Sequence, residues 1–211
     1  MSLDYGIVGN CRSAALISQN GSVEWMCLPH FNSSSVFAKI IDTNKGGSFE
    51  IQVNEEYSIA QEYIYETNIL STIFSDGENS FEIIDFMPRY KDNNGLYNPP
   101  DLIRYVKLIS GIPKFKILYN PQLEYAQYTT KHADEIEFIK SYTADGVYDS
   151  LYLYTSFNKT DILQGAEIEL YEDGFFLTSY HQKLLQQTVY RQYLKMQRTL
   201  VYWLDWTNNL T

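Results

Sequence analysis

The sequence predicts a mainly β protein, a large antiparallel two-sheet β-sandwich (a supersandwich) followed by one C-terminal amphipathic helix. Three observations predict it: Asx-Gly pairs between strand-like runs, further short runs rich in β-branched and aromatic residues, and a final segment with helical spacing. The chain has 211 residues, 45% of them hydrophobic. That length and apolar fraction suffice for one sizeable core, so we expect one domain.

Tight turns give the first local signal. Asx-Gly pairs accept the positive φ angles that two-residue hairpin turns require. Three pairs have strand-like runs on both sides, and we therefore expect three hairpins. They are Asn20-Gly21 between 14–18 and 23–28, Asp76-Gly77 between 69–75 and 81–87, and Asp173-Gly174 between 166–171 and 175–179.

Four more runs read as strands, at 102–109, 115–119, 136–140 and 151–157. In 136–140, Ile136 and Phe138 alternate with acidic residues, which predicts a strand with one wet face. The run 151–154 is apolar or aromatic on both faces, so it is covered on both sides or its tyrosines lie under a neighbouring domain. About ten strands at this spacing favour a sandwich.

The pattern changes at His181, after which no Gly or Pro occurs. Apolar residues then recur at steps of three or four, which predicts a helix with one apolar stripe. The stripe residues are Leu185, Val189, Tyr193, Met196, Leu200 and Trp203. We therefore divide the chain into a β-sandwich over 1–180 and a linker helix over 181–211. This last segment is basic, whereas the rest of the chain carries the acidic excess.

Charge and hydropathy exclude several classes of function. With 16 Lys+Arg against 26 Asp+Glu, the net charge is −10, which argues against nucleic acid or an anionic membrane as a partner. No apolar run approaches the length of a membrane span, and Met1–Gly9 lacks the pattern of a signal peptide. We expect a soluble, cytoplasmic protein. Its two cysteines, Cys11 and Cys27, are expected to be buried and reduced.

Motifs for chemistry are not found. The three histidines stand far apart and the two cysteines cannot form a zinc site, so we expect no metal and no cofactor. Nucleophile-elbow and phosphate-loop patterns do not occur. Glu24 and Asp85 are embedded in apolar sequence, where a structural hydrogen bond is favoured over acid–base work.

Several segments, taken together, resemble a known family. The long run Tyr5–Phe37 is similar to the opening of the N-terminal domain in bacterial and archaeal members of glycoside hydrolase family 15, the glucoamylase and trehalase-like enzymes. The similarity continues, in the family's order, through Thr67–Leu70, Asp85–Pro88, Pro121–Tyr125 and Tyr202–Trp206. It spans essentially the whole chain.

The resemblance implies a β-sandwich, then a linker helix, then an (α/α)6 barrel in the same polypeptide. The barrel carries two catalytic glutamates, a general acid and a base, which stand about 6.5–9.5 Å apart in inverting enzymes. On this reading the chain holds no catalytic residue, Glu24 included, and meets an α-glucoside only through the barrel. No cofactor is implied.

The same resemblance suggests which residues meet the barrel. Trp203 and Trp206, on the terminal helix, are expected at the domain interface. The alternative is a helix fully docked on its own sandwich. Arg12 is a further candidate for substrate contact, but an internal salt bridge to a buried carboxylate, such as Asp85 or Glu24, is favoured for it.

The loop 29–35 is the candidate for the rim of the active site. Its residues His30, Phe31 and Asn32 offer donors for sugar hydroxyls and a ring for a sugar face. Many relatives have Arg and Asp in place of His30 and Asn32, which favours a purely structural loop as the alternative.

Three hypotheses for function follow. The first is the β-sandwich module of an inverting glycosidase that acts on an α-glucoside, such as trehalose or a malto-oligosaccharide. The second is a free-standing carbohydrate-binding sandwich, suggested by the 16% aromatic content. The third is a structural role in which the terminal helix forms a homodimer.

Overall fold

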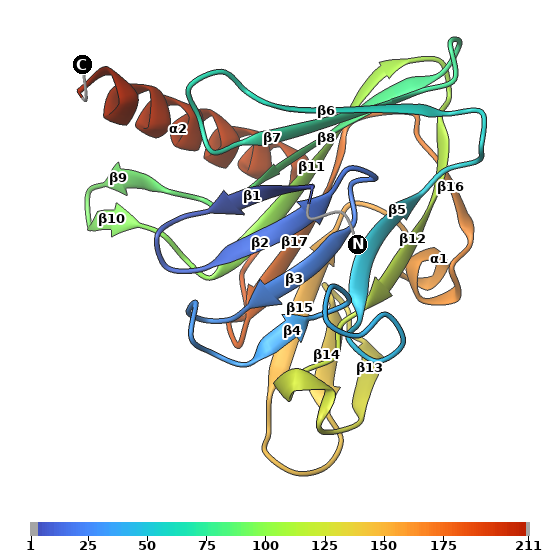
Figure 1. Cartoon of the computed structure of the whole chain (residues 1–211), viewed down its shortest axis with the longest axis vertical. Helices are drawn as coiled ribbons and strands as arrows, with labels where there is room; N and C mark the ends of the chain where they lie inside the picture. The colour runs from blue at the N-terminus through green and yellow to red at the C-terminus, as the bar shows by residue number, and fades with distance from the viewer. Residues whose placement is uncertain (1–3, 210–211) are drawn as a thin grey trace.

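The computed structural model describes residues 4–209, and its architecture is two facing antiparallel sheets with a long helix on the outside (Figure 1). The seven-stranded sheet has the order β1-β2-β3-β5-β12-β16, with β4 paired to β3. Its strands are β1 Tyr5–Gly9, β2 Ala14–Ser18, β3 Val23–Cys27, β4 Ser35–Phe37, β5 Ser48–Gln52, β12 Lys114–Asn120 and β16 Glu167–Glu169.

The eight-stranded sheet has the order β13-β14-β15-β17-β11-β8-β7-β6. Its strands are β6 Ser58–Tyr63, β7 Leu70–Ser75, β8 Ser80–Phe86, β11 Asp101–Ser110, β13 Thr130–Asp134, β14 Ile139–Thr143, β15 Ser150–Thr155 and β17 Gly174–Tyr180. The remaining elements are the small hairpin β9 Tyr90–Asp92 and β10 Gly95–Tyr97, the one-turn η1 Glu124–Ala126, and the helices α1 Lys159–Gln164 and α2 Val189–Asn208. Neither helix is long and apolar enough within residues 4–209 to span a membrane.

The eight-stranded sheet is covered on both faces. One face joins the seven-stranded sheet in the main core, which includes Phe49, Phe81 and Phe176. The other face carries a second core, in which Met196 of α2 packs with Tyr154 and other residues of the sheet. The prediction that 151–154 is covered on both sides is confirmed, because the leucines of β15 enter the first core and its tyrosines the second. The β-sandwich with one long C-terminal helix is likewise confirmed.

The hairpins at Asn20-Gly21 and Asp76-Gly77 are confirmed as β2–β3 and β7–β8. The third predicted hairpin is wrong, because β16 pairs with β12 in one sheet whereas β17 pairs with β11 and β15 in the other. Asp173 explains the crossing. Its carboxylate accepts hydrogen bonds from the Tyr105 hydroxyl (2.8 Å) and the Leu108 amide (2.9 Å), which ties this turn to β11.

Two further boundaries differ from the expectation. The segment 136–140 becomes a strand only at Ile139, since the residues before it turn between β13 and β14 and leave Ile136 97% exposed. The terminal helix begins at Val189 rather than near His181, because the Thr188 hydroxyl caps it by accepting from the Arg191 amide (3.2 Å). Leu185 therefore lies outside the helix and is exposed.

A buried ion pair within the eight-stranded sheet also links that sheet to the other one. Arg104 of β11 is fully buried and binds Asp85 of β8 through Nε (2.8 Å) and a second nitrogen (3.2 Å). The same guanidinium donates to the carbonyls of Phe49 (2.9 Å) and Gly21, both in the opposite sheet. It also lies over the Phe49 ring, 4.8 Å from the centroid. Four acceptor oxygens, two of Asp85 and the carbonyls of Phe49 and Gly21, therefore compensate a charge whose burial would otherwise be costly.

Neither Asp85 nor Glu24 is the partner of Arg12, whose charge acts instead on another buried carboxylate, that of Asp101. Arg104 takes Asp85, and Glu24 accepts from the Tyr5 hydroxyl (2.6 Å) and lies 3.8 Å from the Lys39 ammonium. The sequence alone did not predict the Arg104–Asp85 pair, because the two residues meet only through the register of β11 on β8.

A second buried carboxylate lies under α2. Asp101 is fully buried, and neither side-chain oxygen has a hydrogen-bond partner among the described residues. Burial raises its pKa to about 6, although the charge of Lys195, the hydroxyl of Ser179 and the charge of Arg12 oppose the rise. Burial also lowers the pKa of Lys195. The contact between α2 and the sheet therefore contains charges that are only partly compensated.

Replacing Arg104 tests the ion pair. We expect Arg104→Met to lower the free energy of unfolding by about 3–5 kcal/mol, because Asp85 is left buried without its partner. Lys107→Met is the matched control on the same strand, where an exposed lysine pairs with Glu82 at 3.2 Å and is worth under about 1 kcal/mol. Urea unfolding measures both. Equal losses in the two variants would contradict the assignment.

Asp101 predicts a pH dependence of stability. Its pKa is about 6 in the folded chain and 3.8 ordinarily, so between these values the folded state binds more protons. The carboxyl's stabilising contribution is therefore greatest at low pH and is lost as the pH rises from about 4 to about 6, by roughly 3 kcal/mol. Asp101→Asn should flatten this slope. If the free energy of unfolding changes by the same amount between pH 4 and pH 7 in both proteins, the prediction is contradicted.

Candidate functional site

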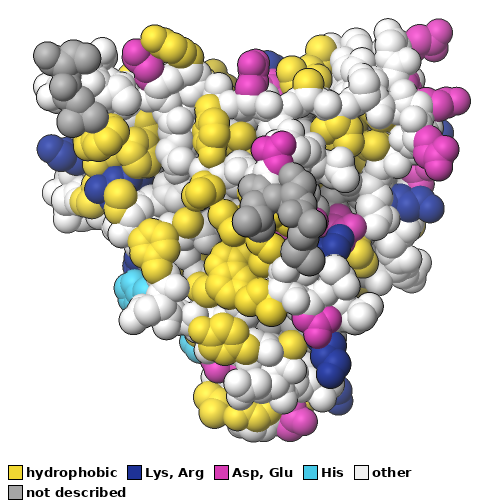
Figure 2. All heavy atoms as spheres, viewed as in Figure 1, with side chains coloured by type: hydrophobic (Ala, Val, Ile, Leu, Met, Phe, Trp, Pro, Cys, Tyr) yellow, Lys and Arg dark blue, Asp and Glu magenta, His cyan; other side chains and the backbone are white. Residues whose placement is uncertain are grey.

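A predominantly apolar hollow lies where α2 meets the N-terminal strands. Its volume is about 590 Å³, and its lining includes Ile7, Cys11, Phe31, Tyr63, Trp203 and Trp206. Only Glu66 brings a charge to it among the described residues. Phe31 is 60% exposed, and Ile7 and Trp206 are each 49% exposed. Figure 2 shows hydrophobic side chains gathered across the middle of this face, over β1 to β4.

Side chains from the opposite sheet hold the β1 wall of the hollow. The Tyr63 hydroxyl accepts from the Ile7 amide (2.6 Å) and donates to the Ile7 carbonyl (3.0 Å). The Asn68 side chain donates to the same carbonyl (2.8 Å) and accepts from the Gly9 amide (2.5 Å). The edge of β1 is therefore already paired, and its side chains, rather than its backbone, remain available to a partner.

The loop 29–35, which joins β3 to β4, is hydrogen-bonded to η1, a turn with a strained backbone. Glu124, Tyr125 and Ala126 all have positive φ angles, of 53°, 56° and 57°. Such a conformation costs roughly 1–2 kcal/mol per residue for residues with a side chain, and it persists only where its surroundings enforce it. Here Glu124 accepts from the Ser34 hydroxyl (2.9 Å), and the Tyr125 hydroxyl donates to the Ser33 carbonyl (3.1 Å).

The other wall of the hollow is α2, which is docked on one side only. Gln192, Met196 and Thr199 are buried against the sheet, while Tyr190 and Val201 are more than half exposed. Arg89 fastens the helix by donating to the Tyr202 hydroxyl (2.9 Å) and to the Asn10 carbonyl (2.6 Å). The helix thus combines a docked face with several exposed apolar side chains, among them Trp206.

The structure brings some of the predicted site residues together and leaves others apart. Phe31 of the loop and Trp203 and Trp206 of the helix line the same hollow. His30 and Asn32 do not line it. Their side chains are exposed and make no hydrogen bond within the described part of the chain.

Sequence reasoning missed the supporting residues. Ile7, Asn68 and Tyr125 lie in segments that carry the family resemblance, but nothing in those segments shows that they meet in space. Both cysteines are free as expected, yet Cys11 is exposed rather than buried. Cys11 lies just after β1, where its backbone adopts a left-handed conformation (φ 63°), and no pattern in the sequence indicated this.

The hollow is suited to binding rather than to hydrolysis. Cleavage of a glycosidic bond requires two carboxyl groups flanking it, and this lining contains one. Within residues 4–209, no three His, Cys, Asp or Glu side chains gather as metal ligands. The exposed aromatic and aliphatic side chains, with backbone groups already paired, are typical of a surface that packs against another folded unit.

Comparison with known proteins shows that the chain is similar to several trehalases. The chain is 30% identical to a trehalase of Thermoplasma volcanium over 210 residues, which are 97% of the chain and 33% of that protein. It is 29% identical to a trehalase of Thermoplasma acidophilum over 201 residues, 93% of the chain and 34% of that protein. It is 40% identical to trehalase 1 of Sulfolobus acidocaldarius over 84 residues, 39% of the chain and 14% of that protein.

The chain thus spans about a third of the length of the two Thermoplasma relatives. Its residues 4–152 match the family described as "Trehalase-like, N-terminal". That match covers the β1 and loop 29–35 side of the hollow, including Ile7 and Phe31, and the Asp85–Arg104 pair of the core, but not α2. The chain therefore belongs to the trehalase-like N-terminal domain family.

Proposed function

We propose that this chain is the N-terminal, non-catalytic module of an inverting glycoside hydrolase that acts on an α-glucoside, trehalose being the substrate named in its relatives. In this proposal the sandwich comprises residues 1–180 and the connector 181–211, and residues 1–3, 210 and 211 lie outside the described part of the chain. The observation that carries the proposal is the apolar hollow, in which an N-terminal loop and the terminal helix present Phe31 and Trp206 to solvent.

The partner in this proposal is an (α/α)6 catalytic barrel in the same polypeptide. Two facts support it. The Thermoplasma trehalases that the chain resembles are about three times longer than the matched region, and the C-terminal end of α2, where Trp206 is 49% exposed, points away from the two sheets (Figure 1). Burying such side chains against a second domain contributes about 25 cal/mol per Å² of apolar surface. His30 and Asn32, beside the hollow, are proposed to face the rim of the barrel's active site.

Activity tests the division of labour. We expect the purified 211-residue chain to release no glucose from trehalose or maltose, because its candidate site lacks the paired carboxylates of a glycosidase. The polypeptide expressed from the complete reading frame should release glucose. Release by the 211-residue chain that one substitution within it abolishes would overturn the proposal.

The hollow is tested in that complete polypeptide by the double variant Ile7→Ser, Phe31→Ser. Loss of two apolar contacts should weaken the interface between the two domains by roughly 2–4 kcal/mol. The two domains should then unfold in two separate thermal transitions instead of one, and calorimetry detects this change. Ile112→Ser is the matched control, since Ile112 is 46% exposed and does not line the hollow. Unchanged unfolding of the double variant would contradict a domain interface here.

A further inference from the structure

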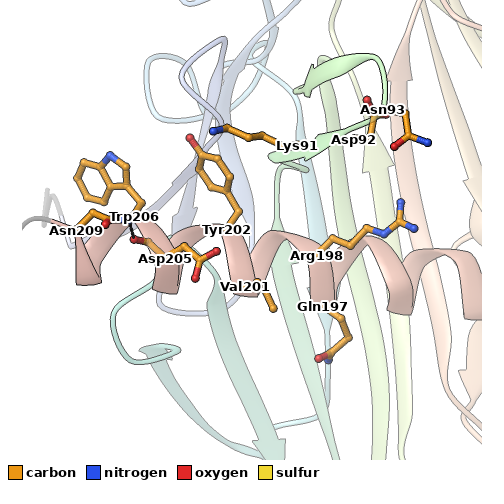
Figure 3. Close-up of a pocket in the computed structure, with 10 residues that line it drawn as sticks. All are labelled: Lys91, Asp92, Asn93, Gln197, Arg198, Val201, Tyr202, Asp205, Trp206 and Asn209. Carbon is orange, nitrogen blue, oxygen red and sulfur yellow. Dashed lines mark hydrogen bonds between the residues drawn. The ribbon is translucent and has the colours of Figure 1, made fainter.

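A second hollow lies on the other side of Trp206, between α2 and the β9–β10 hairpin. Its volume is about 840 Å³, within the range of roughly 300–1,000 Å³ that small-molecule sites occupy. Figure 3 shows Arg198 and Tyr202 pointing from the helix toward the hairpin, where Lys91 and Asn93 lie. Of the residues that line it, the family resemblance gave a role only to Trp206, at the domain interface, and it gave none to the hairpin.

The aromatic component of the hollow comes from two residues one helical turn apart. Tyr202 and Trp206 are separated by four residues, which corresponds to about 6 Å along the helix. Arg89 binds the Tyr202 hydroxyl and lies over its ring at 5.1 Å, so this ring is held in place. Trp206 meets Trp203 edge-on at 5.9 Å and is 49% exposed, so ring surface remains accessible to a ligand.

The polar component is balanced in charge. Lys91 and Arg198 supply two positive charges, and Asp92 and Asp205 supply two negative charges. A balanced set favours neither an anion nor a cation, but it offers both donors and acceptors. The Lys91 and Asn93 side chains make no hydrogen bond or ion pair within residues 4–209, so their polar groups are available to a ligand.

An uncharged ligand with many hydroxyl groups and an apolar face fits both components. Its hydroxyls pair with amide, carboxylate and ammonium groups, and its C–H face packs on an indole ring. We propose that the hollow between α2 and the β9–β10 hairpin is a binding site for a neutral oligosaccharide, with Trp206 as the stacking ring and Asn93 as a hydrogen-bonding partner. This goes beyond the proposed function, because it assigns sugar contact to this chain itself.

Calorimetric titration of the 211-residue chain with maltotriose, and separately with trehalose, tests the site. We expect saturable binding with a dissociation constant near the millimolar range, about −4 kcal/mol. Trp206→Ala should weaken it roughly tenfold and Asn93→Ala several-fold, since each removes one contact. Circular dichroism checks that both variants are folded.

Ile112→Ser is the matched control, because Ile112 is 46% exposed and lines neither hollow. It should leave sugar affinity unchanged. The proposal is overturned by the absence of heat at tens of millimolar sugar, by variants at Trp206 and Asn93 that bind normally, or by tighter binding of inorganic phosphate than of either sugar. None of these results bears on the domain interface, which Ile7 and Phe31 test separately.

Discussion

The Arg104–Asp85 pair is the constraint on which the arrangement of the two sheets depends. A charge placed between two apolar layers is tolerated only if it is paired with an opposite charge and each of its nitrogens finds an acceptor. Arg104 meets this condition by binding Asp85 in its own sheet and the carbonyls of Phe49 and Gly21 in the other. These bonds specify how one sheet lies on the other, because a shift of either would leave a buried guanidinium without its partners.

The eight-stranded sheet then determines where a partner can bind. Because one of its faces is closed by the other sheet, α2 can dock only on the opposite face, where Met196 packs with Tyr154. Arg89 fixes the helix beside β1 and the loop 29–35. That placement creates a hollow on each side of Trp206, one predominantly apolar and one that combines aromatic with charged side chains. The proposed domain interface and the proposed sugar site both follow from the docking of one helix.

Local patterns predicted much of the fold and failed where the chain crosses between sheets. Asn20-Gly21 and Asp76-Gly77 are hairpin turns, as their chemistry requires. Asp173-Gly174 has the same chemistry but joins strands of different sheets, because Asp173 is bound by Tyr105 of β11. Of the predicted site residues, Phe31 and the two tryptophans meet, yet their shared hollow depends on Ile7 and Tyr63, which no local signal connects to them.

By itself, the sequence determined the strand-rich class, the terminal helix and the family resemblance, since these depend on residue order and on turn and periodicity rules that act over a few residues. Only the tertiary structure decided that Arg104 rather than Arg12 binds Asp85, and that Phe31 faces the helix that carries Trp206. The physical reason is the same in both cases. These contacts join residues far apart in the chain, and sheet register and helix docking, rather than local propensity, bring them together.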